Sequence, residues 1–84
     1  MESNTLNREF FVLPTGAIFN QGELESLGFI FLDNSNGTKQ TLLLPKGWML
    51  KRNGCYWYSF IDSNGIPIVT FNRLHNIFFV RSCP

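Results

Sequence analysis

Short runs of apolar and β-branched residues alternate with Asn, Gly and Pro along the whole chain, which is typical of short antiparallel strands joined by tight turns. Asn-Gly pairs at residues 36–37, 53–54 and 64–65 each lie between two such runs. Because a type I′ turn needs positive φ at both central positions, which Asn and Gly tolerate best, each pair predicts a two-residue hairpin. The predicted strands cover residues 9–13, 17–20, 28–33, 39–44, 47–52, 55–62, 66–72 and 77–82. The sequence therefore predicts an all-β domain, an antiparallel meander of short strands in a curved sheet or small barrel.

The pattern leaves room for at most one short helical turn. Residues 23–27 have helical propensity, and Gly28 suits the position just after a helix end. Pro and Gly at residues 14–16 and 45–47 predict breaks between strands. Pro67 follows a tight turn by two residues, which predicts an open edge or a bulge in its strand.

Hairpin geometry assigns the side chains of the later strands to two faces. A turn at residues 64–65 places Tyr58 opposite Phe71, and a turn at residues 53–54 places Met49 opposite Tyr58. One predicted face then carries Met49, Lys51, Tyr56, Tyr58, Phe60, Val69 and Phe71, and the other carries Trp48, Leu50, Trp57, Ile61 and Ile68. Both faces are apolar, whereas an antiparallel sheet with one face in water alternates with polar residues. We therefore expect a homo-oligomer in which a second subunit covers one face, with closure of the sheet into a barrel as the alternative.

Length and composition strengthen the expectation of a protein partner. The chain has 84 residues, which we interpret as one domain, 1–84, with a small core. Charged residues make up 15% of it, against about 25% in an average domain, and aromatic residues make up another 15%. So few charged residues leave few groups to cover the surface of the domain, and we expect another protein to cover part of it. The net charge of +1 supplies no field that would attract nucleic acid.

The N-terminal segment and the two cysteines indicate the cellular compartment of the protein. Residues 1–11 start polar and acidic and lack the apolar stretch of a signal peptide, and no run approaches the roughly 20 apolar residues that cross a bilayer. Cys55 and Cys83 form neither a disulfide framework nor a metal-ligand spacing. The sequence therefore predicts a cytoplasmic protein with reduced thiols and no membrane contact.

Two related loops, FLDNSNG at residues 31–37 and FIDSNG at residues 60–65, raise the question of a calcium site. A loop of the EF-hand type needs a Glu at its twelfth position, where Leu44 stands in the first of the two. We expect instead that each Asp accepts backbone N–H bonds at the loop entrance.

The sequence offers no catalytic constellation. His75 is the only histidine, and the nearest acid in sequence, Asp62, is separated from it by a whole predicted strand. Nucleotide-binding glycine motifs and paired carboxylates at catalytic spacing are missing from the sequence. We therefore predict a protein that is not an enzyme and uses no cofactor or metal, with His75 in a loop.

Aromatic residues near cations form the candidate binding set. Its members are Trp48, Lys51, Arg52, Tyr56, Trp57, Tyr58 and Arg73. Such residues pack cores, serve as anchors of protein interfaces, and stack the bases of a nucleotide or single-stranded nucleic acid. The sequence leaves these three interpretations open.

Residues 44–71 resemble a pattern found in small uncharacterised proteins of phages and bacteria. The likeness is carried by Leu44, Pro45, Gly47, Trp48, Asp62 and Gly65. It implies an accessory or virus-associated protein and no particular activity. Our first hypothesis is accordingly a non-catalytic protein-interaction module, such as a phage or viral accessory or inhibitor protein, that acts through an aromatic surface. The alternatives are a protein that sequesters a small nucleotide ligand at subunit interfaces and a structural assembly subunit.

Overall fold

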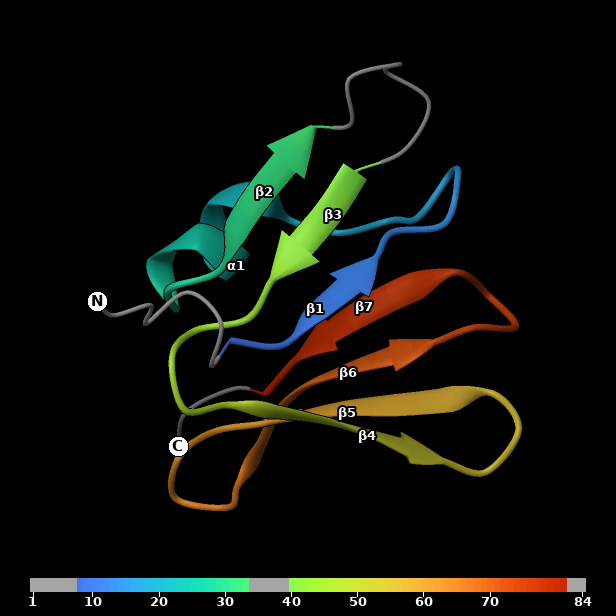
Figure 1. Ribbon diagram of the computed structural model, residues 1–84. Coiled ribbons are helices and arrows are strands. Elements are labelled where there is room, and N and C mark those ends of the chain that lie inside the picture. Colours follow the sequence, from blue (N-terminus) through green and yellow to red (C-terminus); the bar gives the residue numbers. More distant parts are fainter. Residues whose placement is uncertain (1–7, 34–39, 82–84) are drawn as a thin grey trace.

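The computed structural model describes residues 8–33 and 40–81, which form short strands and one short helix (Figure 1). In chain order the elements are β1 (Phe10–Val12), α1 (Gln21–Ser26), β2 (Ile30–Asp33), β3 (Gln40–Leu43), β4 (Met49–Asn53), β5 (Trp57–Ile61), β6 (Pro67–Asn72) and β7 (Ile77–Val80). The prediction of an all-β antiparallel fold with one short helical turn is confirmed. Of the predicted strand 17–20, only Ile18 forms a bridge, parallel to Ile77.

The strands form two open sheets rather than a closed barrel. One sheet has three strands in the order β1-β3-β2, and the other has four in the order β4-β5-β6-β7. Figure 1 shows the three-stranded sheet stacked over the four-stranded one, with α1 beside β2. The four-stranded sheet is the predicted meander, but β1 pairs with β3 across a connection that contains α1 and β2. The prediction that the whole chain follows a meander is therefore wrong at its N-terminal end.

The inner faces of the two sheets share one hydrophobic core. Phe11 of β1 lies among four rings of the opposite sheet, with centroid distances of 5.4 to 6.2 Å. The fully or nearly fully buried core residues are Leu13, Leu24, Phe29, Leu42, Leu44, Phe60, Val69, Phe71 and Phe78. Each sheet thus covers one apolar face of the other, so these inner faces need no second subunit.

Helix α1 is fixed by a cap at each end. The side chain of Asn20 accepts the backbone N–H of Glu23 at 3.1 Å. At the other end Gly28 has a φ of 107°, and the N–H of Phe29 donates to the carbonyl of Leu24 at 3.2 Å. This arrangement matches a Schellman motif, in which an apolar contact accompanies the hydrogen bonds, and both Leu24 and Phe29 are buried. The predicted role of Gly28 is confirmed.

The predicted turn between β4 and β5 is wrong. Met49 lies opposite Ile61 rather than Tyr58, because the strands are joined by a longer loop than the predicted two residues. Gly54 has a φ of 72°, but Asn53 has no positive φ, so a type I′ turn does not form there. The register differs from the prediction by three positions, and an odd shift moves every side chain of β4 to the other face.

This shift changes which residues of β4 reach the core. Leu50 lies opposite Phe60 rather than Trp57 and packs against the core. Met49 and Lys51 lie on the outer face of the sheet, where both are exposed. The predicted grouping of Met49 and Lys51 with Tyr58 is therefore wrong.

The β5–β6 hairpin follows the predicted register through a different turn. Tyr58 lies opposite Phe71 as predicted, and the register shifts next to Ile61, which pairs with Pro67. This register shift next to Pro67 agrees with the bulge that was one of the two predicted alternatives. Asn64 lacks the positive φ of a type I′ turn, so the two-residue turn predicted here is wrong.

Asp62 organises the loop between these strands. Its Oδ1 accepts the backbone N–H groups of Asn64 and Ile66, both at 2.9 Å. The predicted structural role of the second loop aspartate is thereby confirmed. The hairpin predicted at residues 36–37, in the loop after Asp33, lies outside the described residues.

Candidate functional site

The structure places the predicted binding residues at a packing position, on an outer surface and in a pocket, with Arg52 apart from all three. Trp48 precedes β4 and packs edge to face on Phe29, with a centroid distance of 5.2 Å. It is half-buried against the core, so most of its ring is engaged inside the protein. Trp48 is therefore placed as a packing residue, apart from the other members of the set.

Trp57 lies on the outer face of the four-stranded sheet. Its ring lies 6.1 Å from that of Phe79 on β7, although the side chains are 42% and 48% exposed. Lys51 shares the face, and the exposed Tyr56 lies in the adjoining loop. We call these residues the outer aromatic surface: Met49, Lys51, Tyr56, Trp57 and Phe79. Sequence reasoning missed Phe79, although the alternation along β7 signals that it lies opposite to the buried Phe78.

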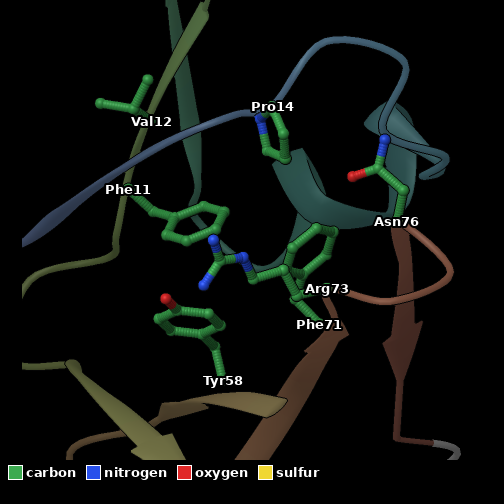
Figure 2. Close-up of a pocket in the computed structure, with 7 residues that line it drawn as sticks. All are labelled: Phe11, Val12, Pro14, Tyr58, Phe71, Arg73 and Asn76. Atoms are coloured by element: carbon green, nitrogen blue, oxygen red, sulfur yellow. The ribbon is translucent and has the colours of Figure 1, made fainter. Parts of the chain in front are cut away.

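A pocket between the two sheets brings Tyr58 and Arg73 together. It has a volume of about 320 Å³, and its lining residues are Phe11, Val12, Pro14, Tyr58, Phe71, Arg73 and Asn76. Figure 2 shows the guanidinium of Arg73 pointing toward the rings of Phe11 and Tyr58. The centroid of Phe11 lies 5.4 Å from those of both Tyr58 and Phe71, so three rings form the apolar wall.

Arg73 is held at this pocket by its backbone. Its N–H donates to the carbonyl of Tyr56 at 2.7 Å, which fixes the start of the β6–β7 turn. Within residues 8–33 and 40–81 its exposed side chain forms no hydrogen bond or ion pair. Among the described residues, no acidic side chain lines the pocket. The pocket therefore combines an aromatic wall with an uncompensated positive charge.

Asn76 ties the rim of the pocket to the N-terminal part of the chain. It has a φ of 60°, a conformation that Asn adopts more readily than most residues. Its side-chain Nδ2 donates to the carbonyl of Thr15 at 3.0 Å, and its carbonyl accepts the N–H of Ile18 at 2.8 Å. These bonds hold the β6–β7 turn against the segment after β1.

Arg52 and His75 lie near these features without lining the pocket. Arg52 is opposite Tyr58 on the edge strand β4 and is exposed. His75 lies in the β6–β7 turn, as predicted, and its backbone N–H donates to Oδ1 of Asn72 at 2.8 Å. Over the described part of the chain, no three His, Cys, Asp or Glu side chains are placed to hold a metal ion.

Over residues 8–33 and 40–81, no helix has the length and apolar character to cross a membrane. Cys55 is exposed in the β4–β5 loop, and Cys83 lies outside the described residues.

Comparison of the chain with protein-family models, with curated proteins and with solved structures finds no match. No relative therefore supplies a function for these residues.

Proposed function

We propose that the protein is a non-catalytic interaction module that binds another protein through its outer aromatic surface. The observation that carries this function is the contact between Trp57 and Phe79, two large rings that touch each other while nearly half of each side chain faces solvent. The outer face of an antiparallel sheet is normally polar where it meets water. Paired rings on such a face indicate a surface that a partner covers.

The chemistry of this surface fits a protein interface. Tryptophan and tyrosine are the residues that most often contribute large binding free energies, because each buries about 150 to 250 Å² of surface at low entropic cost. Lys51 lies on the same face, opposite Ser59 of β5, where a cation contributes to orientation and association rate. The resemblance of residues 44–71 to small uncharacterised proteins of phages and bacteria supports a phage, viral or host protein as the partner.

The test is affinity purification from the source cells, followed by mass spectrometry. The Trp57→Ala variant should lose the copurifying partner and keep the circular dichroism of a β protein. Ile66→Ala is the matched control, because Ile66 is similarly exposed but lies in the β5–β6 loop. A folded Trp57→Ala variant that retains the same partner would contradict the proposed surface.

The outer face of the three-stranded sheet supports the proposed self-association. Cross-strand pairing puts six uncharged side chains on this face, in two rows of three. One row is Phe10, Leu43 and Ile30, and the other is Val12, Thr41 and Leu32. The four that belong to edge strands are 41% to 62% exposed. Because these six side chains carry no charge, a second copy of the same face is a matched complement in a two-fold dimer. We therefore propose a homodimer through this face.

A further inference from the structure

Strand β1 has one backbone edge that no described residue uses. The strand pairs only with β3, and in an antiparallel pair alternate residues direct their backbone groups toward the partner. The N–H of Leu13 donates to the carbonyl of Gln40 at 2.8 Å, so the odd-numbered residues of this segment face β3. Phe10 and Val12 therefore direct their N–H and C=O groups away from the sheet. Within residues 8–33 and 40–81, no hydrogen bond satisfies these groups.

The pocket with Arg73 lies directly beside this edge. Phe11 and Val12 of β1 line it from one side, and Tyr58 and Phe71 line it from the opposite sheet (Figure 2). Its volume of about 320 Å³ lies near the lower end of the range of about 300 to 1,000 Å³ for ligand pockets. The pocket therefore has room for a side chain of a strand that lies along β1.

The charge of the pocket determines which side chain fits. Arg73 presents a guanidinium without a carboxylate partner among the described residues, and the other lining residues are uncharged. A guanidinium binds a carboxylate through two parallel hydrogen bonds, and apolar rings beside the pair exclude water and strengthen it. An aspartate or glutamate therefore complements the pocket.

We propose that β1 is a docking strand for an extended acidic segment of a partner protein. The segment pairs with the free backbone groups of Phe10 and Val12, as in other cases of strand addition to a sheet edge, and places a carboxylate against Arg73. This site goes beyond the proposed function, because it lies on the inner side of the four-stranded sheet and Trp57 lies on the outer side. It also uses the backbone of β1, whereas the proposed dimer face uses the side chains of Phe10 and Val12.

The experiment is a selection of random eight-residue peptides displayed on phage, carried out in parallel on the full-length protein and on its Arg73→Glu variant. On the full-length protein we expect enrichment of peptides with Asp or Glu at one fixed position. Arg73→Glu should weaken the binding of the best synthetic peptide by about tenfold or more, the effect of losing a charged hydrogen-bonded pair. Lys46→Glu reverses the charge of an exposed cation that does not line the pocket and should leave the affinity unchanged.

Backbone pairing is tested on the peptide, so that it does not depend on the folding of any variant. Only every second N–H of an added strand faces β1. N-methylation at alternate positions should therefore abolish binding, while methylation at the positions between them should leave it intact.

Three results would overturn the assignment of an acidic strand to this edge. They are selected peptides without a fixed acidic position, equal binding by the Arg73→Glu variant, and equal tolerance of N-methylation at every position. Displacement of the peptide by adenosine monophosphate from the Arg73 pocket would assign the pocket to a nucleotide and would also count against it. Trp57→Ala should bind the peptide normally, so failure of the outer aromatic surface and failure of this site are distinguishable.

Discussion

The ring of Phe11 lies 5.4 Å from the ring of Tyr58, and this contact joins the two sheets of the protein. Phe11 belongs to the three-stranded sheet and Tyr58 to the four-stranded sheet. The same two rings form part of the wall of the Arg73 pocket. The packing that holds the sheets together thus also shapes the proposed binding site.

Phe11→Ala should destabilise the protein by about 3 kcal/mol, because it removes a ring that touches four others and leaves a cavity between the sheets. Phe79→Ala is the matched control. It removes the same side chain from an exposed position and should cost about 1 kcal/mol or less. Urea unfolding followed by circular dichroism measures both. Equal losses would mean that Phe11 does not join the sheets.

Two glycines of the helical segment should respond to alanine with opposite signs. Gly28 has a φ of 107°, and an added Cβ would lie 3.3 Å from Pro45, so Gly28→Ala should cost about 1 to 3 kcal/mol. Gly22→Ala lies within α1, where the nearest atom is at 3.6 Å, and should stabilise by about 0.5 kcal/mol. Thermal unfolding of the two variants gives the comparison. A Gly28→Ala variant with unchanged stability would disprove the expected strain at the helix end.

Asp62→Ala should destabilise the β5–β6 hairpin by about 1 to 2 kcal/mol, because two backbone N–H groups lose their acceptor. Asn64→Ala keeps the backbone donor and should change stability by less than about 0.5 kcal/mol. Amide hydrogen exchange should show the loss of protection at Asn64 and Ile66 in the first variant only. Unchanged protection in Asp62→Ala would show that the carboxylate does not hold the loop.

Self-association should depend on the outer face of the three-stranded sheet. Leu32→Lys places a charge among uncharged side chains of the proposed interface and should shift the protein from dimer to monomer in sedimentation equilibrium. Met49→Lys, on the outer face of the other sheet, should leave the dimer intact. A wild-type protein that stays monomeric at high micromolar concentration would disprove the dimer.

Local patterns in the sequence predicted the elements well, since every observed strand overlaps a predicted one. The end of α1 was predictable because Gly28 is a local signal for a left-handed residue. The register of β4 against β5 was not, because a loop with Gly54 in its first position replaces the two-residue turn that Asn53 and Gly54 favour. In the observed register Leu50 packs against the core, a tertiary contact that the turn residues do not signal.

The candidate site was predictable only in part, for the same reason. Tyr58 and Arg73 come together through the β5–β6 hairpin, whose register the sequence predicts, but the other wall of the pocket comes from β1. No local pattern signals the long-range pairing of β1 with β3 that brings Phe11 there. Trp57 and Tyr58 are neighbours in sequence, but strand alternation places them on opposite faces of the sheet. The predicted set therefore separates into a packing residue, an outer surface, a pocket and the isolated Arg52 on β4.

Site-specific photo-crosslinking in the source cells tests the outer aromatic surface most directly. Phe79→p-benzoylphenylalanine places the reactive group on that surface. The same substitution at Ile66 places it on the exposed β5–β6 loop of the same four-stranded sheet. We expect a discrete crosslinked partner protein from position 79 and none from position 66. Crosslinks at neither position, or the same products at both, would contradict a protein-binding role for this surface.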